Sequence, residues 1–161
     1  MNPNGFGTWL SDWMWSLPLI ALTVVIHVCG LAVIGERVIA ALSESVDPRR
    51  FIFKFARVMG VTSLLATILH GFESGIWAAA YRLLGALPDT RTAMLYSLSA
   101  ITSYGHANLY LENRWQLMGA LEALDGMLLF GLTTAFLFAM IQRVWPLGRS
   151  YDVRHSTQTH K

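Results

Sequence analysis

The sequence is short of charge and of cysteine. Only 14% of its 161 residues are charged, against about a quarter in an average soluble domain, whereas 54% are hydrophobic. Residues 13–35 contain no aspartate, glutamate, lysine or arginine, and about 20 such residues suffice for a helix to cross the hydrocarbon of a bilayer. Cys29 is the only cysteine, which excludes a disulfide scaffold and a cysteine-rich metal site. A water-soluble globule is therefore a poor interpretation of this chain.

Two further absences limit the function. The 12 basic residues nearly balance the 10 acidic ones, and no basic stretch is interleaved with aromatic residues, so we expect no nucleic-acid binding. The chain has neither a nucleophile elbow for serine catalysis nor a glycine-rich phosphate loop. We therefore expect no enzyme activity, no small-molecule substrate and no bound cofactor or metal.

Three long apolar segments dominate what is present. They cover about residues 16–35, 58–81 and 116–141, and each can satisfy its own backbone hydrogen bonds as a helix inside lipid. Tryptophan and tyrosine residues flank the segments, as in the aromatic belts at membrane interfaces. We therefore expect an all-α, polytopic protein with three transmembrane helices, surrounded by membrane lipid.

Basic residues set the expected orientation. Nine of the 12 lysine and arginine residues lie within 36–57 or after residue 142, and the other three lie within 82–115. Because basic loops stay in the cytoplasm, we expect the C-terminus inside and the N-terminus outside an inner (plasma) membrane. The N-terminus lacks a basic region and leads into an apolar stretch too long for a cleavable signal peptide, so the first span should be retained.

Residues 92–111 carry no formal charge but are rich in serine, threonine, glycine and tyrosine. This segment is too polar for an ordinary span and too apolar for an external loop. Irregular backbone enters a membrane only where it is surrounded by protein or lines a water-filled cavity, so we expect a re-entrant hairpin. Residues 88–92 favour a helix start with Asp or Thr as its cap, which predicts a short helix over 93–101 that ends near Thr102. The carbonyl end of that helix would favour a cation.

The run Leu95–Asn108 resembles the pore helix and filter of the two-span potassium-channel pore module, whose usual form is YFSLVTxTTVGYGD. Residues 121–131 are similar to the inner helix of that family, and Gly126 stands at its hinge glycine. The resemblance covers about residues 58–142, so the first span is additional. The gapless matches are Ser97-Leu98 to SL, Thr102-Ser103 to TT, and Gly105 to the first filter glycine.

The resemblance implies a pore for potassium or another monovalent cation, built as a homotetramer with one re-entrant pore helix and one filter-like loop in each chain. Ala107 replaces the second filter glycine, where a left-handed backbone would cost about 1 kcal/mol or more. A second register, which aligns Tyr104-Gly105 with the YG of the family, also remains open. The implied constriction consists of Thr102, Ser103, Tyr104, Gly105, His106 and Ala107.

The expected domains follow from this resemblance. Residues 1–57 hold the first span and a cytoplasmic loop, in which 43–50 form a turn before a helical approach to the second span. Residues 58–145 form the channel-like module. Residues 146–161 form a polar tail, which we expect to be disordered.

Glu73 lies on one helical face with His70 and Trp77, because the three are spaced by three and four residues. A carboxylate at the centre of a span costs about 2.5–3.5 kcal/mol and is usually functional or paired. Glu73 therefore either supports the pore segment, with His70 or a filter donor as its partner, or meets water near the outer interface.

Glu122 and Asp125 are three residues apart in the outer half of the third span. In the channel interpretation, one of these two carboxylates faces the ion path below the filter and attracts cations, and Asp125 is favoured over Glu122 for that role. Glu122 could instead point toward the interface or pair with Arg114.

Two other functions remain open. His106, Ala107 and Asn108 replace the positions that define the filter mouth, which favours a non-conducting scaffold or sensing partner with the same fold. His27 and His70 could ligate a haem between two helices, although buried histidines that hydrogen-bond to a neighbour are the simpler interpretation.

Overall fold

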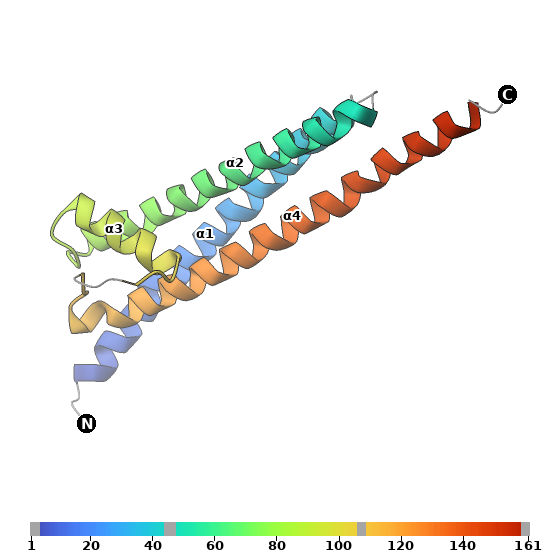
Figure 1. Ribbon diagram of the computed structural model, residues 1–161. Coiled ribbons are helices and arrows are strands. Elements are labelled where there is room, and N and C mark those ends of the chain that lie inside the picture. The colour runs from blue at the N-terminus through green and yellow to red at the C-terminus, as the bar shows by residue number, and fades with distance from the viewer. Residues whose placement is uncertain (1–3, 44–47, 106–108, 159–161) are drawn as a thin grey trace. The chain divides into compact units, whose positions relative to one another are not determined.

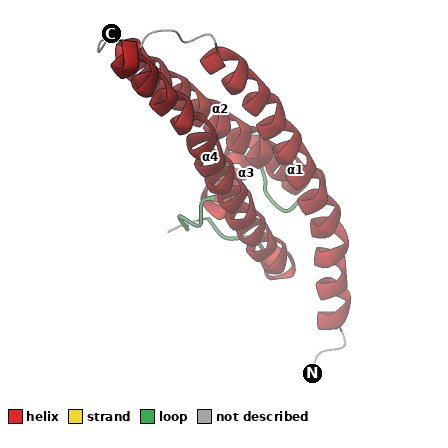
Figure 2. Ribbon diagram, turned by 90° about the vertical axis from the view of Figure 1, so that its right-hand side faces the viewer, coloured by secondary structure: helices red, strands yellow, loops and turns green. Residues whose placement is uncertain are grey.

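The structure is a computed structural model that describes residues 4–43, 48–105 and 109–158. Within these ranges, helices are the only regular secondary structure (Figure 2), so the expected all-α class is confirmed there. The elements in chain order are α1 (Asn4–Ser43), α2 (Pro48–Leu83), α3 (Thr90–Ile101), the 3-10 helix η1 (Asn113–Trp115) and α4 (Gln116–Gln158) (Figure 1).

Three helical stretches are long and apolar enough to cross a membrane. They are Trp9–Ala41, Ile52–Leu83 and Asn113–Arg143, and each contains one of the three segments predicted from the sequence. The prediction of three helices long and apolar enough to span a membrane is therefore confirmed. The first two stretches lie within α1 and α2, and the third begins in η1 and continues in α4. A helical backbone suits such stretches because every backbone group inside lipid needs a partner in its own segment.

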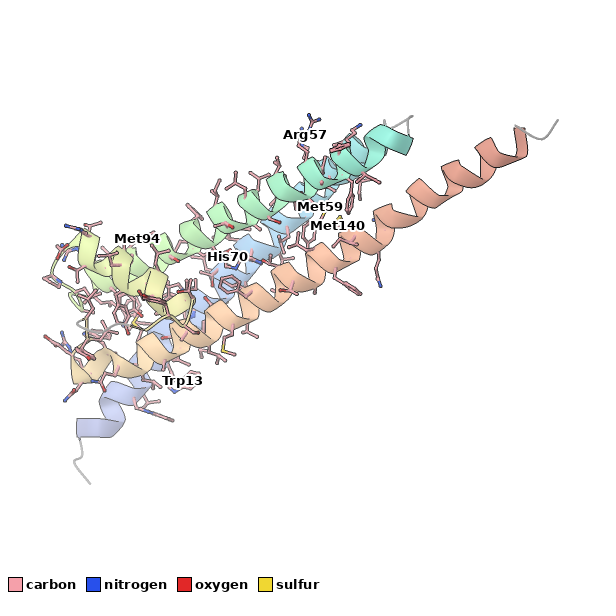
Figure 3. The ribbon with its side chains drawn as sticks, viewed as in Figure 1. Trp13, Arg57, Met59, His70, Met94 and Met140 are labelled. Carbon is pink, nitrogen blue, oxygen red and sulfur yellow. The ribbon has the colours of Figure 1, made fainter. Side chains whose placement is uncertain are left out.

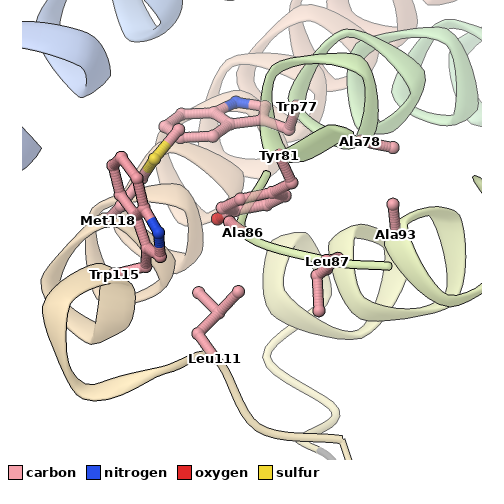
Figure 4. Packing of buried hydrophobic residues seen from close by; sticks show 9 residues of the cluster. All are labelled: Trp77, Ala78, Tyr81, Ala86, Leu87, Ala93, Leu111, Trp115 and Met118. Carbon is pink, nitrogen blue, oxygen red and sulfur yellow. The ribbon is translucent and has the colours of Figure 1, made fainter. Parts of the chain in front are cut away.

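The chain divides into two compact units. Unit 1 consists of residues 1–28 and 68–131, and unit 2 of residues 29–67 and 132–161. In unit 1, Trp77 and Tyr81 of α2 pack with Met118 of α4 in one buried cluster (Figure 4). The other buried members of this cluster are Ala78, Ala86, Leu87, Ala93, Leu111 and Trp115.

Unit 2 has a smaller core, in which Val38 of α1 and Met140 of α4 are buried. Met59 and Phe136 pack against them, and Figure 3 labels the two methionines. A Cβ atom at Gly35 would lie 3.1 Å from the Phe136 ring, so a glycine at this position allows the ring to approach α1 closely.

The turn between α2 and α3 contains a glycine ending of α2 and an acidic cap of α3. The amide of Ala86 donates to the Tyr81 carbonyl over 2.9 Å, and Gly85 between them has φ +68°, which is the helix ending that glycine favours. Asp89 then caps α3, because its carboxylate accepts from the backbone N–H of Thr92 at 2.9 Å and from the Thr92 hydroxyl at 2.6 Å. The predicted helix start, with its acidic cap, is therefore confirmed.

Two expectations about the ends of the spans have different outcomes. The helical approach to the second span is confirmed, since α2 begins at Pro48, while residues 44–47 of the expected turn lie outside the described residues. The expectation of a disordered tail after Pro146 is wrong, because α4 continues to Gln158. Extending an existing helix avoids the unfavourable nucleation step, so polar residues can continue it.

Candidate functional site

Unit 1 buries polar side chains from all four of its helices. In hydrocarbon such groups cost free energy unless they are hydrogen-bonded or paired, so their partners define what the unit can do. The buried polar residues of unit 1 are Asp12, Ser16, Thr23, His27, His70, Glu73, Ser74, Ser97, Glu122 and Asp125.

Glu122 of α4 joins two other helices. Its carboxylate accepts hydrogen bonds from the Tyr81 hydroxyl of α2, at 2.7 Å, and from the Ser97 hydroxyl of α3. The Ser97 hydroxyl also lies 2.7 Å from the backbone carbonyl oxygen of Ser74 in α2. Glu122 is fully buried, and Arg114 pairs with Glu112 at 3.2 Å, so the alternative in which Glu122 pairs with Arg114 is wrong.

Asp125 faces the interior of unit 1. Its Oδ2 atom accepts from the Thr23 hydroxyl of α1 at 2.7 Å and from the Trp77 indole N–H of α2 at 3.0 Å. Its Oδ1 atom is buried and has no hydrogen-bond partner within the described part of the chain. Asp125 therefore links α4 to α1 and α2.

Glu73 is fully buried, which excludes the alternative in which it meets water at the interface. Its Oε1 atom lies 2.8 Å from His27 Nδ1 of α1. The hydrogen-bond partner of Glu73 is therefore His27, whereas the sequence analysis predicted His70 or a filter donor. The Glu73 Oε2 atom is buried and meets no hydrogen-bonding group among the residues that the structure describes.

His70, labelled in Figure 3, is also buried, and its ligand nitrogen lies within 4.8 Å of the ligand atoms of this pair. Its ring meets the His27 ring edge to face, with centroids 4.9 Å apart, and stacks on Phe130 at 4.3 Å. The two imidazole rings are in direct contact, which leaves no room for a porphyrin plane between them. The geometry therefore contradicts the haem alternative.

The short helix α3 ends near Thr102, as predicted. The amide of Tyr104 donates to the Ser99 carbonyl, and the amide of Ser103 to the Ala100 carbonyl, both over 2.9 Å. This pair of bonds is the Schellman ending, and it holds Ser103 at φ +54°, a left-handed conformation that usually takes glycine.

The expected constriction is only partly within the described residues. Thr102, Ser103, Tyr104 and Gly105 are exposed in the chain, and Gly105 has φ +77°. His106 and Ala107 lie outside the described residues, so the backbone predicted for Ala107 stays a prediction.

Gly126, the predicted hinge, lies inside the continuous helix α4. A Cβ atom at this position would overlap the backbone carbonyl of Ile101, the last residue of α3. The glycine therefore lets the C-terminal end of α3 pack directly on the backbone of α4. Whether α4 bends at Gly126 stays a prediction.

Sequence reasoning identified most of the buried charges but missed several of their partners. Thr23 and Ser97 gave no separate signal, because a threonine or serine in a helix is a common residue with many roles. The pairing of His27 with Glu73 joins residues 46 positions apart, and helical spacing relates only residues on the same helix.

Comparisons of the chain with models of known families, with curated proteins and with solved structures found no match. The geometry described above is therefore the basis on which a function can be argued.

Proposed function

We propose that the chain forms a pore for monovalent cations, such as potassium, in a membrane where four copies surround one axis. The observation that carries this proposal is the packing of the Ile101 carbonyl on Gly126. It fixes the C-terminal end of a short helix against a spanning helix, as a pore helix requires.

The anchoring of α3 on both sides supports the proposal. Ser97 reaches the Ser74 carbonyl of α2 and the Glu122 carboxylate of α4, so one side chain links α3 to two long helices. A helix end carries about half a negative charge at its carbonyl terminus, which favours a cation beyond Thr102. Residues 102–107 would then form the constriction.

In this proposal the buried carboxylates support the pore from behind. Glu73 and Asp125 link α2 and α4 to α1 through His27 and Thr23. The first span, which the resembling family lacks, would thereby brace the pore module. Asp125 would act as a pore-supporting residue, since its partners lie within its own unit.

Four copies are needed because one chain offers only a quarter of a coordination ring. We expect the purified protein to be a tetramer in mild detergent. We also expect proteoliposomes that contain it to take up potassium or sodium along an imposed gradient. The matched variants for this assay are Gly126→Ala, which should lose flux, and Gly131→Ala, whose added Cβ meets no neighbour and which should keep it.

A folded tetramer that passes neither ion would contradict the proposal. A stable monomer or dimer would also contradict it, because neither can close a fourfold ring.

A second function, a non-conducting scaffold or sensing partner, is favoured by the ending of α3. The carbonyls of Ser99 and Ala100 at the end of α3 both accept hydrogen bonds from backbone amides, so this helix end offers a cation less negative charge than an open carbonyl terminus would. Under this alternative the unaltered protein passes no ions and Ala107→Gly allows conduction to appear. Conduction by the unaltered protein would exclude it.

A further inference from the structure

We propose that His27, His70 and Glu73 bind a divalent transition-metal ion of the zinc class in the interior of unit 1. The three side chains come from α1 and α2 and are buried, and their ligand atoms all lie within 4.8 Å of one another. The site is separate from the proposed constriction, so it goes beyond the proposed function.

The spacing of the ligand atoms suits a small metal ion. Zinc lies about 2.0–2.2 Å from histidine nitrogen and carboxylate oxygen, which places the ligands of a tetrahedral site about 3.4 Å from one another. His27 Nδ1 and Glu73 Oε1 are already 2.8 Å apart. Binding would replace this hydrogen bond by two metal–ligand bonds, and the ligand atoms, which all lie within 4.8 Å of one another, would have to approach to about 3.4 Å.

The charges around the cluster also favour a dication. The Glu73 carboxylate has one oxygen engaged by His27, while its Oε2 atom is buried without a hydrogen bond from any described residue. In the same unit, the Oδ1 atom of Asp125 is likewise buried without a hydrogen bond from any described residue. Two carboxylates in a low-dielectric interior repel each other and are costly when ionised. A divalent ion bound to Glu73 would reduce this cost.

The donor set selects the class of metal. Two imidazoles and one carboxylate suit zinc, cobalt, nickel or ferrous iron, whereas calcium and magnesium prefer sites made of oxygen atoms. Three protein ligands leave one coordination position outside the set, and the Asp125 carboxylate is the nearby group that can stabilise the charge of the complex. The metal would be coordinated by residues of both α1 and α2, so it would cross-link these two helices in addition to the contacts already described.

The site can be tested with cobalt, which reports tetrahedral coordination through its visible absorption. The full chain, purified in mild detergent without a histidine tag and stripped with a chelator, is titrated with Co²⁺ and then with Zn²⁺. We expect one Co²⁺ per chain, with a tetrahedral spectrum that zinc abolishes by displacement. The variants His70→Gln and Glu73→Gln should each weaken binding by at least about tenfold.

A matched variant keeps the proposed site and removes the other histidines. The triple variant His106→Ala, His155→Ala and His160→Ala retains only His27 and His70, and we expect it to bind Co²⁺ with unchanged stoichiometry. Zinc should also raise the melting temperature of this variant but not that of Glu73→Gln.

Two results would overturn the proposal. One is a parent chain that binds neither Co²⁺ nor Zn²⁺ when it is folded and stripped. The other is a triple variant that loses the bound metal, which would assign it to the remaining histidines. Both measurements are made on chains that retain the buried cluster, so they decide the question even if the His70→Gln or Glu73→Gln chain does not fold. Neither depends on ion flux, so the result is independent of whether the chain forms a pore.

Discussion

Gly126 shows how a single missing side chain sets the position of a helix. Replacing it with alanine would force the Cβ atom into the Ile101 backbone, and backbone cannot move aside as a flexible side chain can. We expect Gly126→Ala to lower the free energy of unfolding by about 1–3 kcal/mol. Thermal melting of the purified protein in detergent would measure this loss.

Gly131 provides the control for this substitution, because it lies on the same helix and an added Cβ meets nothing within 4 Å. The Gly131→Ala variant should melt at or slightly above the temperature of the parent, since alanine favours helix. Equal melting temperatures for both variants would show that α3 does not pack on α4 at Gly126.

Ser103 is a second residue at which the backbone conformation determines how a substitution changes the stability. It occupies a left-handed conformation with φ +54°, which costs a non-glycine residue about 1–2 kcal/mol. Glycine removes this cost but is freer in the unfolded chain, so we expect Ser103→Gly to stabilise the protein by about 0.5–1 kcal/mol.

The matched change is Gly85→Ser at the end of α2, where the glycine has φ +68° in the same kind of helix ending. We expect this change to have the opposite sign and a similar size. The two variants can be compared by melting in the same detergent. A loss of stability in Ser103→Gly would mean that the serine side chain contributes more than its backbone costs.

At this scale the sequence identified the residues but not their conformations. Gly126 and Ser103 were assigned to a hinge and a filter on resemblance alone. The left-handed backbone at Ser103 could not be expected, because serine does not favour that region and the hydrogen bonds of the helix ending determine it.

At the scale of an element, the start of α3 depends on one exposed carboxylate. The Thr92 hydroxyl and the backbone N–H of Thr92 both donate to Asp89, and these bonds lower the pKa of Asp89 below its ordinary value of 3.8. A carboxylate whose pKa is lower in the folded state contributes stability above its unfolded pKa. That contribution is lost as the pH falls through the folded pKa.

We therefore expect the first turn of α3 to loosen when the pH is lowered below about 4. Hydrogen exchange of the amides at residues 91–93, corrected for the intrinsic effect of pH, would detect this as a loss of protection. The control is Asp89→Asn, which keeps an oxygen acceptor at the cap but has no titration. If the asparagine variant showed the same loss of protection, Asp89 would not be its source.

The elements were predictable to different degrees. The start of α3 followed from a proline and an acidic cap, which act locally and so are visible in sequence. The helix after Pro146 was missed because its residues show no apolar periodicity. Its conformation follows from the preceding span of α4, which already supplies the helical hydrogen bonds from which further turns can grow.

At the scale of the whole molecule, the distribution of basic residues predicts the topology. We expect Arg91→Cys, in a background with Cys29→Ala, to react in intact spheroplasts with a maleimide that cannot cross membranes. Arg91 is exposed in the first turn of α3, on the side assigned to the outside. Arg50→Cys, in the segment assigned to the cytoplasm, should react only after permeabilisation.

If Arg50→Cys, but not Arg91→Cys, were labelled before permeabilisation, the orientation would be the reverse of the predicted one. If both variants were labelled before permeabilisation, the protein would have a mixed topology. A third variant within residues 95–101 should be protected from the reagent if α3 re-enters the membrane, and reactive if it lies freely outside.

The three spans were predictable because hydrocarbon imposes the same condition on every segment that crosses it. The contacts between spans were not, because residues such as Thr23 and Asp125 are 102 positions apart. Sequence shows which polar groups are inside the membrane and need partners, and only the packing of helices decides which partner each obtains.

The double attachment of Ser97 also dictates an order of events during synthesis. Its partner on α2 is synthesised before α3, whereas Glu122 follows α3 in the chain. At about 5–20 residues per second, the nascent protein must wait a few seconds before α4 emerges. During that interval α3 can contact α2 but not yet Glu122 of α4. A chain released before its last span would therefore leave the polar residues of α3 exposed to the insertion machinery and to proteases.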